Sequence, residues 1–321
     1  MIISASRRTD IPSYYADWFF SRIKEGFVLA RNPMNFHQVS KISLSPDAVD
    51  GIVFWTKNPI PMLNRLSGLD DYMYYFQFSL TPYGKDIEPN LPSKNDELID
   101  AFKQLSSIIG ADRVIWRYDP ILINEKYTTE YHVRAFEKIA RELHSYTHKV
   151  TISFIDVSYR GVKGNMKELA LLDFPPDAQA ELCTILADIA HHNRLTIDTC
   201  AEKIDLAQLG IGRARCIDGA LLTKLTGYDL DIAKDKNQRP ECGCTASVDI
   251  GAYNTCLNGC RYCYANYRLH AVDGNYAMHD LHSPLIVGDV GDEDRVTERR
   301  PTPRIGRHKA HSYKETPCQQ K

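Results

Sequence analysis

The sequence lacks the features that mark several common classes of protein. It has no apolar run approaching the roughly 18 residues that a membrane-spanning helix needs, and its first residues contain no long apolar core of a secretory signal peptide. Its net charge is −2 over 321 residues, so its composition gives no indication of a nucleic-acid or anionic-membrane partner. These absences favour a cytoplasmic globular protein that does not act at a membrane.

Glycine motifs are sparse as well. No G-x-G-x-x-G pattern follows the first predicted strand, which argues against a dinucleotide-binding domain of the Rossmann type. Cysteine, in contrast, is abundant for a cytoplasmic chain, with nine residues. Without an export signal a disulfide framework is not expected, so we interpret these cysteines as metal-binding or redox-active.

Short apolar and β-branched runs alternate with segments of helical periodicity along most of the chain. This alternation predicts an α/β fold with a parallel sheet, which we interpret as a complete or partial (β/α) TIM-like barrel. An open doubly wound sheet is the alternative. Strands are predicted at residues 2–4, 27–30, 51–55, 74–79, 114–117, 150–154 and 195–199.

Helices are predicted between most of these strands. Ser93 is expected to cap a helix that ends at Gly110, Thr129 to open a second helix, and Asp177 to cap a third. The alternation stops after about residue 230. We therefore expect three segments: a barrel over 1–230, a cysteine-rich iron–sulfur segment packed on it over 231–290, and a largely flexible tail over 291–321.

Polar residues follow the predicted strands where the chain leaves each one. Because the active sites of (β/α) barrels lie at the C-terminal ends of the strands, these residues are candidates for catalysis. The basic ones can hold carboxylate or phosphate groups, and the acidic ones can bind hydroxyl groups or transfer protons. The structural alternative is that they form ion pairs that close the barrel mouth. The predicted catalytic residues are Arg7, Asp10, Lys57, Arg117, Asp119 and Glu202, with Arg31 and Asp156 in equivalent positions.

The spacing C-x3-C-x2-C at Cys256, Cys260 and Cys263 is the most informative motif in the chain. Three thiolates at such spacing can ligate three irons of a [4Fe–4S] cluster and leave the fourth iron open to a small molecule. Zinc is the alternative, but a structural zinc site needs four ligands, so a further residue such as His270 would have to join. We predict an iron–sulfur cluster here.

A second set of cysteines lies upstream of this triplet. Cys242 and Cys244 form a C-x-C pair, Cys200 lies at a predicted strand end, and Cys216 lies between two helical stretches. These four could bind a second metal, either an auxiliary [4Fe–4S] cluster or a structural zinc ion. In the alternative interpretation, Cys200 and Cys216 are small buried apolar residues.

The triplet, with Tyr262 directly before its last cysteine, resembles the motif of the radical S-adenosylmethionine (SAM) enzymes. It lies about four-fifths of the way along the chain, whereas in most of those enzymes it follows the first barrel strand. The chain as a whole resembles DUF1848, a bacterial family whose members carry such a cysteine group near the C-terminus. The matching stretches are ISASRRTD (3–10), FWTKNP (54–59), WRYDP (116–120) and the cysteine-rich residues 242–266.

The radical SAM resemblance implies that the open iron chelates SAM and that one electron, from a donor such as flavodoxin or ferredoxin, splits SAM to a 5′-deoxyadenosyl radical. Tyr262 would then lie beside the adenine, and Arg8 and Asn58 would contact the cofactor. Many of these enzymes bind the SAM amino group with a Gly-Gly-Glu stretch, but no Gly-Gly pair occurs here.

Two alternatives to a radical SAM enzyme therefore stay open. The first is a non-catalytic or electron-transfer iron–sulfur protein. The second is a zinc-stabilised barrel with hydrolytic or binding function. No feature of the sequence selects the substrate, whether a small molecule or a macromolecule.

Overall fold

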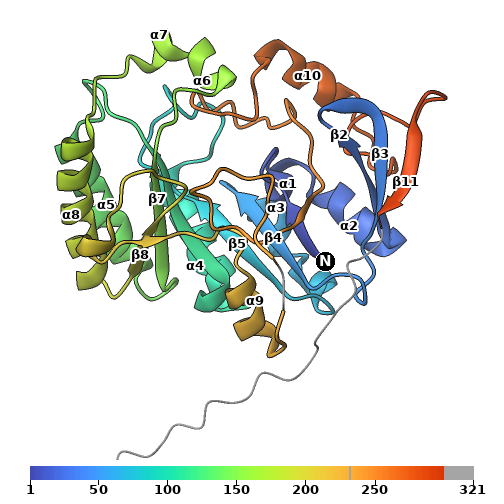
Figure 1. The fold of residues 1–321 in the computed structure, drawn as a ribbon, viewed down its shortest axis with the longest axis horizontal. Coiled ribbons are helices and arrows are strands. Elements are labelled where there is room, and N and C mark those ends of the chain that lie inside the picture. The colour runs from blue at the N-terminus through green and yellow to red at the C-terminus, as the bar shows by residue number, and fades with distance from the viewer. Residues whose placement is uncertain (231–232, 300–321) are drawn as a thin grey trace, which may run out of the picture.

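The computed structural model describes residues 1–230 and 233–299, and a parallel sheet of eight strands lies at its centre (Figure 1). Every neighbouring pair in the order β10-β1-β4-β5-β6-β7-β8-β9 is parallel, which confirms the predicted α/β class. The strands are β1 (Ile2–Ala5), β4 (Gly51–Thr56), β5 (Tyr74–Ser79), β6 (Val114–Ile121), β7 (Lys149–Phe154), β8 (Thr196–Thr199), β9 (Gly212–Arg213) and β10 (Val248–Asp249).

From β4 to β9 the order of the strands in the sheet follows the order in the chain, as expected for successive strand–helix units. β10 comes from the cysteine-rich segment and pairs with β1 at the opposite edge. Among the described residues β9 and β10 do not pair with each other, so the sheet is open along that line.

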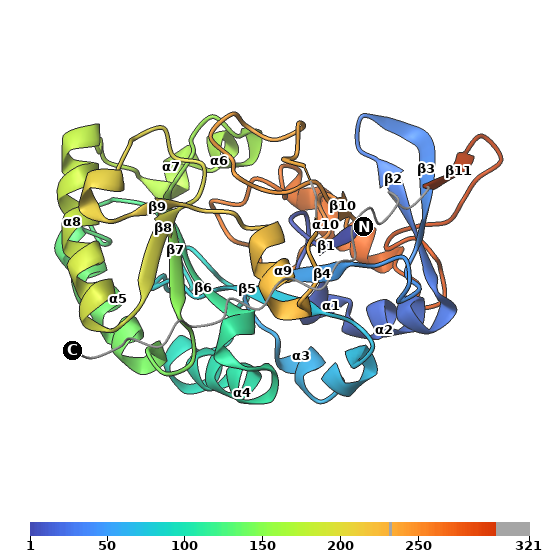
Figure 2. The same ribbon diagram turned by 60° about the horizontal axis from the view of Figure 1, so that its bottom comes forward.

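The predicted strand at 27–30 is not part of this sheet, and its assignment to the parallel series is wrong. It corresponds to β2 (Phe27–Asn32), which pairs antiparallel with β3 (Asn35–Ser43). With β11 (Arg295–Arg299) they form a small sheet at one end of the molecule (Figure 2). Two residues separate β2 from β3, which suits a hairpin but is too short for the crossover of a parallel pair.

Arg31 consequently does not lie at the mouth of the parallel sheet, where its place after a strand predicted it. Its guanidinium instead forms two 2.7 Å hydrogen bonds with the carboxylate of Asp294. β11 also carries regular structure as far as Arg299, into the segment predicted as a flexible tail. The rest of that predicted tail, 300–321, lies outside the described residues.

Helices cover one face of the parallel sheet. Alternate strand residues such as Phe54, Phe76 and Trp116 point to this face and are fully buried in the main hydrophobic core. The helices of the described chain are α1 (Ile11–Tyr14), α2 (Ala16–Glu25), α3 (Ile60–Leu63), α4 (Ile99–Ile109), α5 (Thr129–Leu143), α6 (Arg160–Gly164), α7 (Met166–Leu169), α8 (Pro176–His192), α9 (Gly219–Thr226) and α10 (Leu269–Ala277).

Two of the three predicted helix starts are correct. The Ser93 side chain accepts a hydrogen bond from the Asp96 amide at the turn that leads into α4, and α5 opens at Thr129. The third is wrong, because Asp177 lies inside the first turn of α8 and does not cap it. Pro176 takes the first helical position, where its fixed φ angle suits the helix and its missing amide costs no hydrogen bond.

The opposite face of the sheet is polar toward the C-terminal ends of the strands. Gln77, Arg117 and Ser153 point to this face and are buried there. Near the N-terminal ends, α9 packs across the strands (Figure 2), and its Leu222 joins Val53 and Tyr75 in a second apolar cluster. On this face the polar residues therefore lie toward the C-terminal ends of the strands, and an apolar cluster lies toward their N-terminal ends.

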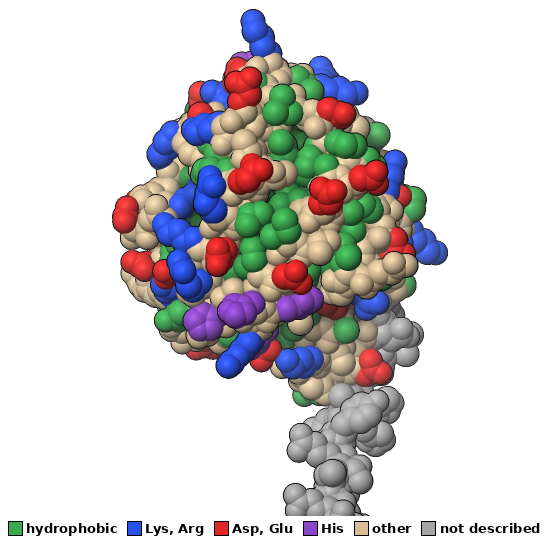
Figure 3. All heavy atoms as spheres, turned by 90° about the vertical axis from the view of Figure 1, so that its left-hand side faces the viewer, with side chains coloured by type: hydrophobic (Ala, Val, Ile, Leu, Met, Phe, Trp, Pro, Cys, Tyr) green, Lys and Arg blue, Asp and Glu red, His purple; other side chains and the backbone are tan. Residues whose placement is uncertain are grey.

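The outer surface on the side of α8 mixes acidic and basic side chains with scattered apolar ones (Figure 3). No single sign of charge dominates this face, in agreement with the small net charge of the chain. Among the described residues no helix is both long enough and apolar enough to cross a membrane.

His132 of α5 is an ionisable group held in the core. Its Nε2 donates to the Leu122 carbonyl at 2.9 Å, which leaves Nδ1 to accept from the Tyr118 hydroxyl at 2.8 Å. Burial lowers the pKa of His132 to about 4, although the hydrogen bond to Leu122 opposes the shift. The imidazole is therefore neutral in the folded protein near neutral pH.

We expect the free energy of unfolding to fall as the pH drops from 6.5 toward 4. The unfolded chain takes up a proton at His132 near the ordinary pKa of 6.5, whereas the folded protein resists protonation until about pH 4. The resulting loss is about 3 kcal/mol at the acid end of this window. Urea unfolding across the window measures it. His132→Asn should lose this part of the slope, and an unchanged slope would contradict the assignment.

Candidate functional site

The cysteine loop, residues 256–263, lies over the C-terminal ends of β1 and β4. Asn258 donates a 3.0 Å hydrogen bond to Asp10, which follows β1. Just after the loop, the Tyr264 hydroxyl donates to the Arg7 carbonyl at 2.5 Å. This is the end of the sheet at which the sequence predicts the polar residues to gather.

Asp10 joins three parts of the site. Its carboxylate accepts hydrogen bonds from the Ser13 amide at 3.1 Å, the Lys57 amide at 2.8 Å and the Asn258 side chain at 3.0 Å. Burial raises the pKa of Asp10, while these donors oppose the shift. Asp10 thus fixes α1, the end of β4 and the cysteine loop to one another.

Glu88 is the most buried charge of the site, and the sequence-based prediction missed it. Its carboxylate lies 2.9 Å from Lys57 Nζ, is paired with Lys94, and accepts a 2.8 Å hydrogen bond from the Thr81 hydroxyl. The Tyr262 hydroxyl of the cysteine loop also donates to it. Burial alone would raise the pKa of Glu88, but Lys57 and Lys94 outweigh this and hold it at about 2. No local pattern marks a glutamate in the loop between β5 and α4.

Lys57 places a positive charge beside the cysteine triplet. Its ammonium lies 5.4 Å from the centre of the Tyr262 ring and interacts electrostatically with Cys260 and Cys263. Although it lies close to Glu88, its Nζ makes no well-aligned hydrogen bond. Burial would lower the pKa of Lys57, but Glu88 and Cys260 raise it above its ordinary value. The group is therefore a charged ammonium with donor capacity to spare.

The three cysteines of the loop suit a shared cofactor in chemistry and placement. Cys256 and Cys260 are buried and Cys263 is half-buried, and burial raises the pKa of all three thiols. They lie close enough to influence one another electrostatically, with Lys57 as the neighbouring cation. In the described part of the chain no group of three or more His, Cys, Asp or Glu side chains is arranged to hold a metal ion as it stands. The thiol donors and the neighbouring Lys57 ammonium fit a cluster, whose presence stays a prediction.

The three residues predicted to contact SAM occupy different surroundings. The Tyr262 side chain is buried and hydrogen-bonded to Glu88, so it anchors the loop. The Arg8 guanidinium lies over the Tyr253 ring, 5.1 Å from its centre, and is half-buried. The Asn58 side chain accepts a 3.1 Å hydrogen bond from the Ile60 amide and shapes the turn after β4.

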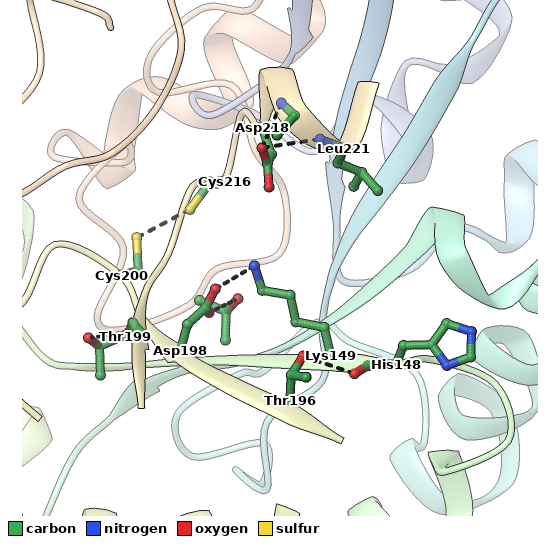
Figure 4. Close-up of polar contacts among 12 residues, drawn as sticks. His148, Lys149, Thr196, Asp198, Thr199, Cys200, Cys216, Asp218 and Leu221 are labelled. Atoms are coloured by element: carbon green, nitrogen blue, oxygen red, sulfur yellow. Dashed lines mark hydrogen bonds and ion pairs between the residues drawn. The ribbon is translucent and has the colours of Figure 1, made fainter. Parts of the chain in front are cut away.

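The second set of cysteines has members that are far apart in the sequence, and Figure 4 shows the sulfurs of two of them, Cys200 and Cys216, directed toward each other. The sulfurs of Cys200, after β8, and Cys216, after β9, lie 3.3 Å apart. Side-chain hydrogen bonds link Cys216 to Cys244 and Cys244 to Cys242. The hydrogen bond with Cys244 lowers the pKa of Cys242 to about 7. Cys216, Cys242 and Cys244 lie in one buried cluster with Cys200 packed against it, and a metal site formed by the four stays a prediction.

Arg117 and Asp119 of β6 connect this cysteine set to the polar face of the sheet. Arg117 donates to the sulfur of Cys216 at 2.9 Å and forms an ion pair with Asp119. The Ser153 hydroxyl also donates to Asp119. Burial would raise the pKa of Asp119, but Arg117 and Ser153 lower it. Both residues are thus charged and mutually paired.

The predicted catalytic residues lie at one end of the sheet, although several already have partners. Asp119 interacts electrostatically with both Lys57 and Glu202, so the charges of β4, β6 and the segment after β8 share one region. Glu202 accepts a 2.8 Å hydrogen bond from the Phe154 amide, and burial raises its pKa. Asp156, in contrast, pairs with Arg239 at 3.0 Å and is partly exposed.

A known protein family covers most of the chain. Residues 2–265 match the domain of unknown function DUF1848. The chain belongs to this family. No curated protein and no solved structure was found to match it. In this DUF1848 protein the matched region runs from β1 through the whole cysteine triplet, so the sheet and the cysteine loop both lie within the family domain.

We expect Gly161→Ala to displace the cysteine loop. A Cβ atom at Gly161 would lie 2.3 Å from the Cys263 carbonyl oxygen, which is backbone and cannot rotate away. Overpacking of this kind costs about 1–3 kcal/mol. Hydrogen–deuterium exchange should show faster exchange over residues 256–266. Gly164→Ala in the same helix is the matched control, because its Cβ would meet nothing within 4 Å. Equal exchange in the two variants would contradict the packing.

Proposed function

We propose that this protein is a radical SAM-like iron–sulfur enzyme built on a partial (β/α) barrel. Cys256, Cys260 and Cys263 would hold a [4Fe–4S] cluster, and SAM would bind at its open iron. The observation that carries the proposal is the seating of the cysteine loop on the C-terminal ends of a parallel sheet, where Asp10 and Glu88 bind it. When bound and reduced by a flavodoxin or ferredoxin, such a cluster supplies the electron that cleaves SAM.

Lys57 and Glu88 would tune the cluster. Three thiolates give the cluster a negative charge that increases on reduction, and the buried Lys57 ammonium beside Cys260 and Cys263 stabilises the more negative state. Glu88 holds that ammonium in place and, through Tyr262, also holds the loop. One buried carboxylate thereby positions both the ligands and their counter-charge.

The remaining predicted residues supply groups for substrate and cofactor. The Arg7 guanidinium, which pairs with Asp249, and the half-buried Arg8 beside Gly251 would take the SAM carboxylate, with Asn58 at the adjoining turn. Arg117, Asp119 and Glu202 offer charged groups on the polar face of the sheet. They would orient the substrate, the chemical class of which stays open.

A non-catalytic or electron-transfer iron–sulfur protein is the second candidate. The observation that favours it is the lining of a cavity of about 370 Å³, to which Glu88 contributes. Its lining includes Tyr83, Lys94 and Tyr131, but none of the cysteines of the loop. A substrate bound in this cavity would not touch the cysteines of the loop, and a cluster out of contact with substrate would suit electron transfer.

The first expected outcome concerns the ligands. Protein purified without oxygen should contain about four irons and four sulfides per chain and absorb near 400 nm. Replacing Cys256, Cys260 and Cys263 together by alanine should abolish this absorbance. Cys183→Ala, in the buried part of α8, is the matched control and should keep it. Full iron content in the triple variant would refute the ligand assignment.

SAM cleavage separates the two candidate functions. Reduced, iron-loaded protein should convert SAM to 5′-deoxyadenosine, which chromatography detects. A loaded protein that takes up an electron but leaves SAM intact would favour the electron carrier.

The second expected outcome concerns Lys57. Lys57→Met removes a buried positive charge near the thiolates and should lower the midpoint reduction potential of the cluster. A unit charge several ångströms away at an effective dielectric constant near 20 contributes about 2 kcal/mol, or roughly 90 mV for one electron. Redox titration followed at 400 nm measures it. Lys126→Met, at an exposed lysine paired with Asp86, is the control. An unchanged potential in Lys57→Met would remove Lys57 from this role.

A further inference from the structure

The four upstream cysteines meet where the parallel sheet is open. Cys200 and Cys216 belong to the segments that follow β8 and β9 at one edge of the sheet. Cys242 and Cys244 precede β10, which forms the other edge. Strand pairing does not join β9 to β10 in the described chain, but the segments beside them meet through the Thr245 amide, which donates to the Ile217 carbonyl at 2.9 Å, and through this cysteine set.

The distance between two of the four sulfurs is compatible with binding to one ion. In a tetrahedral zinc site with Zn–S bonds of about 2.3 Å, neighbouring sulfurs lie about 3.8 Å apart. Cys200 and Cys216 lie at 3.3 Å, close to that separation. A [4Fe–4S] cluster places each ligand on a different iron and spreads the sulfurs farther. The four thiols form a row of contacts and not a shell, so side-chain rotation would be needed to enclose an ion.

The surroundings provide positive charge for thiolates. Zinc with four thiolates carries a net charge of −2, which needs compensation in a buried site. Arg117 donates to Cys216 and interacts electrostatically with Cys200. Arg7 interacts in the same way with Cys244, and Arg239 with Cys200. In addition, the backbone amide of Ile217 donates to the sulfur of Cys244 at 3.4 Å.

We propose that Cys200, Cys216, Cys242 and Cys244 bind a single structural zinc ion that closes the sheet between its two edge segments. The ion strengthens the connection that the Thr245–Ile217 backbone hydrogen bond makes between the two edge segments. It also fixes the segment that leads into β10 and then into the cysteine loop. This zinc site is separate from the proposed iron–sulfur centre and does not depend on it.

The decisive experiment measures metal in the full chain when the triplet cannot bind iron. The variant with Cys256, Cys260 and Cys263 replaced by alanine should contain about one zinc per chain by mass spectrometry and be colourless. Replacing Cys216 and Cys244 by serine should remove the zinc, whereas Cys183→Ser should retain it. Cobalt(II) added to zinc-depleted triplet variant should give the intense visible bands of a tetrahedral tetrathiolate site.

A measurement on the unaltered chain guards against variants that do not fold. Reaction of all nine thiols with an organomercurial should release one zinc per chain. Iron with absorbance near 400 nm in the triplet variant would overturn the proposal in favour of a second cluster. A metal-free chain with a Cys200–Cys216 disulfide, or with four freely alkylated thiols, would overturn it as well. Because zinc and iron are counted separately, failure of this site and failure of the iron–sulfur proposal are distinguishable.

Discussion

The carboxylate of Glu88 is the constraint on which the rest of the site depends. A fully buried charge is costly unless neighbouring charges and donors compensate it, and Lys57, Lys94, Thr81 and Tyr262 all do so. These partners come from the turn after β4, the loop after β5 and the cysteine loop. Satisfying one carboxylate therefore brings a distant C-terminal loop to the mouth of the sheet and places an ammonium beside its thiols.

One face of the parallel sheet packs into the hydrophobic core, and the other face carries the polar residues of the candidate site. Side chains alternate between the faces, so one face packs Phe54, Phe76 and Trp116 against helices while the other carries Gln77 and Arg117. The apolar cluster around Leu222 closes the bottom of the second face. Charged residues at the C-terminal ends can thus be held in place without opening the core, which is what a reactive centre requires.

Much of the fold followed from local patterns, and the misses have physical causes. Apolar runs located six of the seven predicted strands in the parallel sheet, because each strand is buried on at least one face. β2 was misplaced because its apolar run looks like any buried strand, and only the two-residue connection to β3 decides its direction. Asp177 is a residue type that often caps helices, but α8 already begins at Pro176, so Asp177 lies inside its first turn. Glu88 lies in a loop in which no sequence pattern marks a residue of the site, so only its burial in the structure identifies it.

The sequence by itself determined the parallel α/β class and the spacing of the cysteine triplet, because each follows from short local patterns, and it determined the membership in DUF1848, because the matching residues are read in chain order over 2–265. Tertiary structure decided which distant groups meet. Cys200 and Cys244 both lie near Cys216, from opposite edges of the open sheet. Arg31 pairs with Asp294 and does not lie at the mouth of the sheet. Lys57 interacts electrostatically with Cys260. These contacts depend on the order of the strands in the sheet and on the direction of the loops. Burial and charge pairing decide which of them form, and no local sequence pattern predicts either.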